Sequence, residues 1–145
     1  MRRLWLLMAL LVAGCTQLPL TPQDLQARKF EAVPGMSVIY LVRDYPDFSE
    51  VQTTVYLGED IILKTYPGTY YRWEVPPGEH RIRGAAFDTG AIRLTTAPGG
   101  LYFVQQRVTV FFMGNPSSYF QVVPDPPGRA AVQRAVLLTP DRSTF

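Results

Sequence analysis

The chain has 145 residues, and its 14 basic and 12 acidic residues give a formal net charge of +2. Arg2 and Arg3 lie in a segment that we expect to be removed, which leaves basic and acidic residues equal in number. A neutral chain without a run of like charge argues against nucleic-acid binding, which needs a concentrated basic surface, and against a polybasic membrane patch.

The N-terminus has the pattern of a bacterial secretion signal. Two arginines precede an apolar run at residues 4–13, and the sequence LVAGC follows at residues 11–15. Such a run suits a signal peptide and is shorter than the about 20 residues that span a bilayer. The LVAGC segment resembles the lipobox of bacterial lipoproteins, in which small residues precede a cysteine that is acylated and becomes the new N-terminus. The alternative is an ordinary cleaved signal peptide with an incidental cysteine.

We therefore predict that residues 1–14 are removed and that Cys15 attaches the protein to the membrane through more than one acyl chain, which gives stable anchoring. Cys15 is the only cysteine, so no thiol remains for a disulfide. Thr16 rather than aspartate follows it, which in the common lipoprotein sorting rule implies the outer membrane, with the domain facing the periplasm. We expect residues 15–35 to be the lipid-attachment site and a tether, with a brief helix at residues 23–32 and Thr21 as its cap.

Residues 36–138 have the pattern of a small all-β domain. Residues 37–42 are apolar on both faces, which is typical of a central buried strand. Tyr71, Trp73 and Val75 alternate with polar residues, which is the period of a half-buried strand. Proline and glycine turns separate such runs, and this predicts an antiparallel β-sandwich of about eight strands. A short helix is expected at residues 128–138, and residues 139–145 form the tail. The strands are expected at residues 37–42, 51–57, 61–63, 71–75, 80–84, 91–96, 101–110 and 120–123.

Four segments carry a likeness to a known family. They are VIYLVR at residues 38–43, YYRWEVPPGEH at 70–80, APGGLYFV at 97–104 and FQVVP at 120–124. In this order they resemble a family of bacterial envelope proteins known as domain of unknown function 2846. The resemblance implies a small sandwich akin to transthyretin-like or carbohydrate-binding-like domains, often in lipoproteins, and implies no reaction. The chain departs from the family at residues 58–60, where GED stands in place of a turn such as DGK.

The sequence offers no catalytic or metal-binding constellation. A lone base needs an orienting partner and a nucleophile, so we expect His80, the only histidine, to be hydrogen-bonded and to pin the adjacent Pro-Pro-Gly turn. Catalysis, binding or pH sensing by His80 are the alternatives. Asp44 and Asp47 flank a turn, where aspartate is common, and a calcium site is the less favoured interpretation. We predict no catalytic residue, no metal and no cofactor.

Two groups of aromatic residues are candidates for binding. Tyr70 and Arg72 share one strand face; we expect half-buried packing at an edge, and a stacking platform for sugar or peptidoglycan is the alternative. Phe111 and Phe112 are consecutive and precede Met113 in a segment more apolar than one strand face requires. We expect this segment to pack in the core. The alternative is an exposed apolar patch that contacts a partner or a membrane.

Together these observations predict a non-enzymatic, lipid-anchored β-sandwich of the bacterial envelope that acts as a binding or accessory module. Its partners would be the membrane, through Cys15, and an envelope protein. A glycan- or peptidoglycan-binding domain and a structural spacer without a ligand are the alternatives, because β-sandwiches host many functions.

Overall fold

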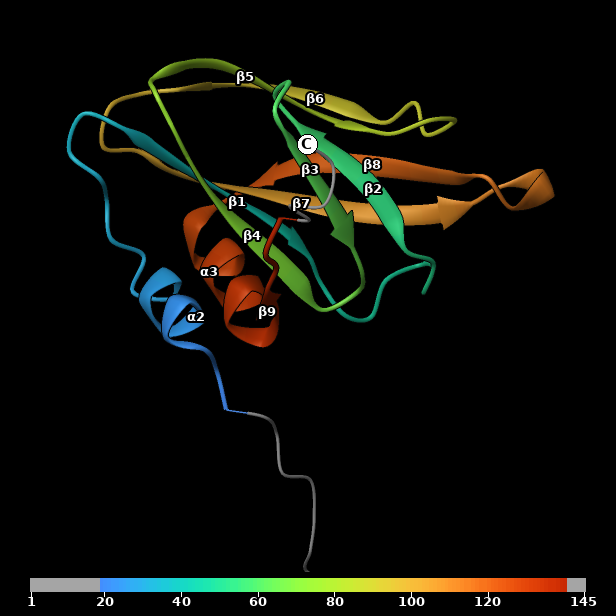
Figure 1. The fold of residues 1–145 in the computed structure, drawn as a ribbon, viewed down its shortest axis with the longest axis horizontal. Helices are drawn as coiled ribbons and strands as arrows, with labels where there is room; N and C mark the ends of the chain where they lie inside the picture. The colour runs from blue at the N-terminus through green and yellow to red at the C-terminus, as the bar shows by residue number, and fades with distance from the viewer. Residues whose placement is uncertain (1–18, 141–145) are drawn as a thin grey trace, which may run out of the picture.

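The computed structural model describes residues 19–140. The predicted signal segment, Cys15 and residues 141–145 lie outside this range. The described elements form three layers, with two β-sheets packed face to face and two helices covering the outer face of one sheet (Figure 1). The predicted β-sandwich is therefore confirmed, with a helical layer added. None of the described helices is both long and apolar enough to span a bilayer.

The first sheet has the strand order β8-β7-β1-β4-β9. Within it β1 pairs in parallel with β7, and β4 pairs in parallel with β9, while the other pairs are antiparallel. The expectation of an antiparallel sandwich therefore needs correction at these two pairs. The bounds are β1 (Ser37–Arg43), β4 (Thr69–Val75), β7 (Leu101–Val110), β8 (Pro116–Val123) and β9 (Val136–Leu137).

The second sheet has the order β3-β2-β5-β6, and all its pairs are antiparallel. Its strands are β2 (Thr53–Leu57), β3 (Ile61–Thr65), β5 (Gly78–Gly84) and β6 (Ala91–Thr96). All eight predicted strands are thus present, and β9 is the strand that the sequence did not reveal. It has two residues, too few for a recognisable alternation.

β1 is the centre of the fold because it is buried on both faces. Ile39 and Leu41 point into the core between the sheets, whereas Val38, Tyr40 and Val42 point into a second core under the helices. This double burial explains the continuous apolar run that predicted the strand.

The helix α2 (Pro22–Ala27) begins with Thr21, whose hydroxyl accepts a hydrogen bond from the Asp24 amide at 3.1 Å. This cap was predicted. Ala27 and Phe30 are buried against the first sheet, with Val33 packed beside them. The segment around α2 is therefore part of the domain, and the predicted tether at residues 15–35 is too long.

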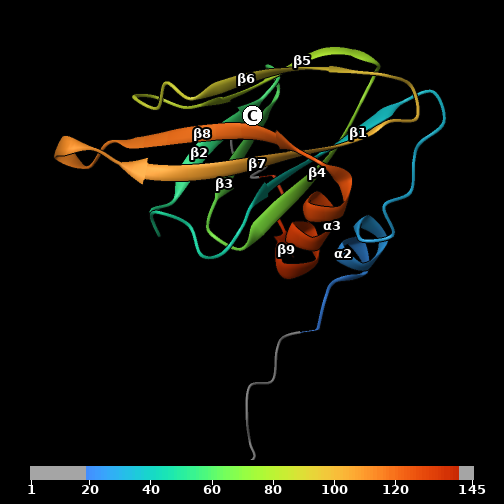
Figure 2. The same cartoon turned by 180° about the vertical axis from the view of Figure 1, so that it is seen from behind.

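The helix α3 (Asp125–Arg134) lies beside α2 on the same face (Figure 2). It starts and ends earlier than the predicted range of 128–138. Gly128, predicted as the first residue of the helix, lies inside α3, where a Cβ would stand 2.3 Å from Phe103 Cγ. Glycine thus permits the helix to approach the sheet closely. Ala131 and Val132 are buried as expected, and Val136 is exposed.

Candidate functional site

Three loops meet at one end of the sandwich, and we call this the loop end. They are residues 44–52 between β1 and β2, residues 85–90 between β5 and β6, and residues 111–115 at the tip of the β7–β8 hairpin. Figures 1 and 2 both show them at the same end, with the hairpin projecting farthest. Arg107 on β7 donates to the Pro46 carbonyl at 2.9 Å, and the Ser118 amide on β8 donates to Asp88 at 2.8 Å. The first two loops therefore flank the base of the hairpin.

Each loop exposes large apolar side chains. The exposed fractions are 74% for Phe48, 81% for Phe87, 66% for Phe111 and 84% for Met113. The expectation that the hairpin segment packs in the core is therefore wrong for Phe111 and Met113. Phe112 belongs to the short turn η2 (Phe112–Gly114), and its side chain lies outside the described part of the structure. Large apolar side chains exposed at one end of a molecule are typical of an interaction surface.

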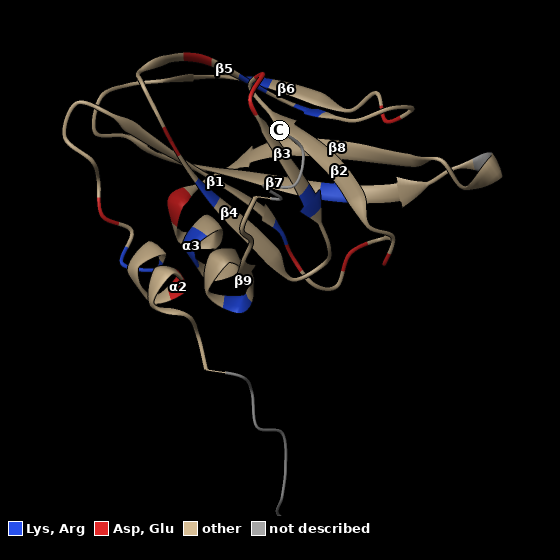
Figure 3. Ribbon diagram, in the orientation of Figure 1, with Lys and Arg blue, Asp and Glu red and all other residues tan. Residues whose placement is uncertain are grey.

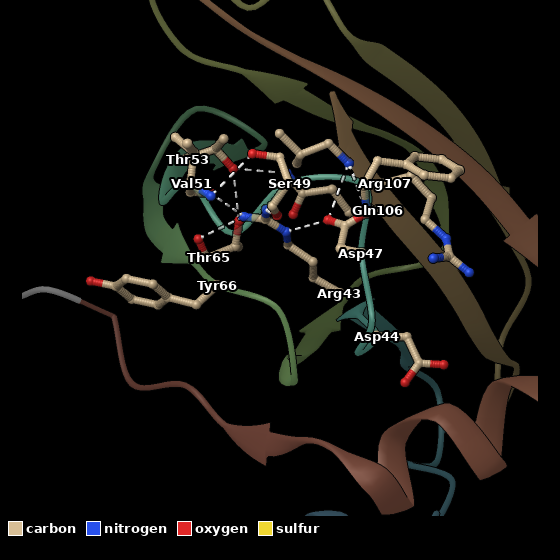
Figure 4. Close-up of polar contacts among 12 residues, drawn as sticks. Arg43, Asp44, Asp47, Ser49, Val51, Thr53, Thr65, Tyr66, Gln106 and Arg107 are labelled. Carbon is tan, nitrogen blue, oxygen red and sulfur yellow. Dashed lines mark hydrogen bonds and ion pairs between the residues drawn. The ribbon is translucent and has the colours of Figure 1, made fainter. Parts of the chain in front are cut away.

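Arg43 supports the first loop from below (Figure 4). It ends β1, and its guanidinium is fully buried. Nε pairs with Asp47 Oδ2 at 2.6 Å, and Nη2 donates to the Ser49 carbonyl at 2.6 Å. Nη1 donates to the carbonyls of Val51 at 2.8 Å and Thr65 at 3.1 Å. A buried charge is tolerated only with such compensation, so this arginine fixes the path of residues 47–51.

Asp47 connects the same loop to β7. Its carboxylate oxygens accept the Val108 amide, each at 3.2 Å, and Oδ1 also accepts the Phe48 amide at 2.7 Å. Asp44 instead pairs with Arg134 of α3 at 2.6 Å. Both aspartates therefore form structural contacts within the domain. Phe48 follows directly after Asp47, so its exposed side chain projects from a fixed part of the loop.

A buried polar network joins the two sheets beneath the loop end. The hydroxyls of Thr53 and Thr65 lie 2.9 Å apart. Gln106 Nε2 donates to Thr53 at 3.0 Å and to Ser118 at 2.9 Å. Because Thr53 belongs to the second sheet and Gln106 to the first, these bonds hold the loop-bearing strands in register. Buried hydrogen bonds of this kind rigidify their surroundings, although Gln106 Oε1 is buried without a hydrogen-bond partner.

The second loop is fixed by Asp88 and Gly90. Asp88 Oδ1 accepts the amides of Gly90 at 3.0 Å and Ser118 at 2.8 Å. A Cβ on Gly90 would lie 1.9 Å from the Ser118 carbonyl oxygen, so only glycine permits this contact between the loop and β8. Phe87 therefore projects from a docked loop.

The backbone is strained at two of the loop tips. Ala86 has φ 55° and Met113 has φ 68°, in the left-handed region that disfavours residues with a Cβ. Each such residue costs about 1–3 kcal/mol, and strain of this kind concentrates at functional sites. Ala86 precedes the exposed Phe87, and Met113 is itself one of the exposed apolar residues.

Tyr70 and Arg72 do not form an exposed platform. Tyr70 is fully buried under α2, where its hydroxyl donates to Asp24 Oδ1 at 2.7 Å. Burial, and then the neighbouring Asp24 carboxylate, raise the pKa of the Tyr70 hydroxyl. The structure thus corrects both the expected half-buried packing of Tyr70 and the alternative of sugar stacking on it. The sequence could not reveal this burial, because the covering helix lies far away along the chain.

Arg72 lines an open cavity of about 580 Å³ between α2 and β4. Its Nε donates to the Tyr40 hydroxyl at 3.3 Å, Nη2 donates to the Glu31 carbonyl at 3.4 Å, and Nη1 pairs with Glu74. The guanidinium is therefore occupied within the chain, and half-buried packing describes it.

His80 lies beside the Pro-Pro-Gly turn, as predicted. Its Nε2 is 2.7 Å from the Pro76 carbonyl, to which it donates, and its ring meets Trp73 edge-on at 5.4 Å. Within residues 19–140 no group of three acidic, histidine or cysteine side chains is placed to hold a metal ion.

Phe48 and Phe87 are the residues of the loop end that the sequence analysis missed. Each phenylalanine lies between two predicted strands and next to an aspartate. A large apolar residue in such a connection was the feature that could have indicated its exposure. No protein-family model matches the chain, and no curated protein is detectably similar to it. The resemblance to domain of unknown function 2846 stays a prediction.

Proposed function

We propose that this protein is a lipid-anchored binding module of the bacterial envelope, without catalytic activity, that holds a protein partner at the loop end. The observation that carries the proposal is the exposure of Phe48, Phe87, Phe111 and Met113 on three separate loops at one end of the sandwich, two of which are fixed from beneath by Arg43 and Asp88. Recognition residues are often placed on loops positioned by a rigid scaffold.

The chemistry of the loop end favours a protein over a glycan. Fully burying one such apolar side chain contributes about 1.5–3 kcal/mol, and aromatic anchors dominate many protein interfaces. A glycan would need polar groups around the aromatic rings. The carboxylates of Asp47 and Asp88 at this end are engaged with backbone amides. Arg107 is also occupied, since it donates to Pro46 and lies 5.4 Å from the Phe48 ring.

The sequence supports an envelope location. The basic start, the apolar run and Cys15 together make the acylation signal described above. The outer membrane, with the domain on the periplasmic side, is the location we propose. The alternative of a spacer without a ligand does not account for exposed phenylalanines on loops with strained backbone at Ala86 and Met113.

The proposal can be tested by retention of envelope proteins on the immobilised, acylated chain. We expect a discrete protein to be retained, and the double variant Phe87→Ser/Phe111→Ser to retain it at least about tenfold less, because two apolar contacts are lost. The control variant Glu59→Ser changes an exposed residue in the β2–β3 turn and should retain the partner normally. Unchanged retention by the double variant, or retention of no protein, would contradict the proposal.

A further inference from the structure

The point where the chain joins the domain limits how far the domain can stand from the membrane. The first described residue is Pro19, and α2 begins at Pro22. Cys15 precedes Pro19 by four residues, which span at most roughly 14 Å when fully extended. If Cys15 is acylated, as the proposed function requires, the face of the domain around Pro19 must lie close to the lipid headgroups.

That face carries an open groove of about 990 Å³ between the start of α2 and the end of α3 with β9. Apolar side chains line it and remain accessible, with Leu20 exposed by 38% and Val136 by 58%. Leu137 lies beside them. The groove therefore offers apolar surface at the place where the anchored chain arrives.

The groove carries cations beside its apolar side chains. Its lining includes Arg28 and Arg134, which pair with Asp24 and Asp44. Arg28 is held inside by Asp24 and by carbonyls of α3, while the Arg134 side chain is 57% exposed at the rim. Figure 3 shows the basic residues at the end of α3 and just after α2. Apolar side chains flanked by cations are typical of surfaces that lie on membranes.

We propose that the groove formed by α2, β9 and the end of α3 is a membrane-contact surface. Leu20 and Val136 enter the boundary between headgroups and acyl chains, and Arg134 at the rim contacts lipid phosphates. The loop at residues 44–52 reaches the rim of this groove through the Asp44–Arg134 pair, but the tip of the β7–β8 hairpin and the β5–β6 loop lie on the far side of the molecule from α2 and remain accessible to a partner (Figures 1 and 2).

Site-directed labelling of the acylated protein tests this orientation. Because acylation of Cys15 consumes the only thiol, a single cysteine at Leu20, Val136 or Phe87 can carry a unique nitroxide. The labelled proteins are reconstituted in vesicles of phosphatidylcholine and phosphatidylglycerol, and relaxation by oxygen is compared with relaxation by a water-soluble nickel chelate. We expect the labels at positions 20 and 136 to favour oxygen, which concentrates in lipid, and the label at position 87 to favour the chelate.

Mass spectrometry of the same samples separates the two ways of failing. Acylated protein whose labels at positions 20 and 136 favour the chelate as strongly as position 87 would overturn the membrane-contact surface and leave the anchor intact. Protein without acyl mass on Cys15 would overturn the anchor, and the membrane-contact surface with it.

Discussion

The helix-covered face of the first sheet and the loop end use similar residues in opposite ways. Under the helices the aromatic rings are buried against one another, as where Tyr40 stacks on Phe103 at 5.2 Å. At the loop end the phenylalanines Phe48, Phe87 and Phe111 are exposed. Both places nevertheless contain a buried charged side chain with several hydrogen bonds, Asp24 under α2 and Arg43 under the first loop.

The exposed aromatic residues are therefore not explained by loose packing of the region beneath them. The loops that carry Phe48 and Phe87 are fixed by a buried ion pair and a close glycine contact, and a threonine–glutamine network joins the strands beneath them. The exposed side chains themselves contribute little to the stability of the fold. Only a second molecule could bury them. Substitutions under the helices should therefore change the stability of the fold, whereas substitutions of the exposed phenylalanines should change partner retention.

The largest expected loss of stability comes from substituting Arg43. This residue ends β1 beneath the loop end, and its guanidinium is fully buried. Arg43→Met should destabilise the protein by about 3–5 kcal/mol, since it leaves the buried Asp47 carboxylate without its partner. Urea unfolding measures this loss. The double variant Arg43→Met/Asp47→Asn should recover part of it, and a loss below about 1 kcal/mol would show that the pair does not hold the loop.

Asp24 should make the helix-covered face sensitive to acid. Burial alone would raise the pKa of this carboxyl, but hydrogen bonds from Arg28, Leu137 and Tyr70 outweigh burial and lower the pKa below its ordinary value of 3.8. The charged carboxylate therefore stabilises the fold above about pH 4, and this contribution is lost as the pH falls through the lowered pKa.

Asp24→Asn should accordingly destabilise the protein by about 1.5–3 kcal/mol at neutral pH. The difference from the unchanged protein should be smaller at about pH 3, because the carboxyl of the unfolded chain is largely protonated there and its charge favours the fold less. Unfolding measured at both pH values checks this. A difference that stays constant with pH would mean that the carboxylate charge is not the cause.

Gly128→Ala tests the contact between α3 and the sheet. The added Cβ would lie 2.3 Å from Phe103 Cγ, so the helix must shift, and we expect a loss of about 1–3 kcal/mol. The matched control is Gln133→Ala, at an exposed position of the same helix, which should change stability by less than about 0.5 kcal/mol. Equal effects of the two variants would contradict the close packing.

The smallest effect is expected at the hairpin tip, and it has the opposite sign. Met113→Gly should stabilise the fold by about 1 kcal/mol, because glycine adopts the left-handed φ of 68° without strain. The same change removes an exposed apolar side chain and should weaken partner retention. Gly114→Ala, at φ 78°, is the control and should destabilise. Thermal unfolding and the retention assay give the two readouts.

The sequence predicted the strands well because their periodicity and turns are local. Residues 37–42 had to be central, since a strand without a polar face is covered on both sides. The burial of Arg43 and Tyr70 could not be predicted in the same way, because their partners Asp47 and Asp24 come from a loop and from a helix outside the sheet.

The candidate site was only partly predictable. The apolar run at residues 108–114 suggested that Phe111 packs in the core, but β7 ends at Val110 and the chain turns away from the sheets. Met113 belongs to the same apolar segment, for which partner contact was the alternative prediction. Phe48 and Phe87 were missed because the convergence of three loops depends on strand order, which short-range patterns do not determine.

In-cell photo-crosslinking tests the central claim most directly. A photoreactive residue is placed singly at Phe87, at Phe111 or at Glu59, and the captured molecules are identified by mass spectrometry. The account predicts that positions 87 and 111, on separate loops, capture the same discrete envelope protein and that position 59 does not. Capture of only bulk cell wall or lipid, or equal capture from position 59, would contradict a binding surface at the loop end.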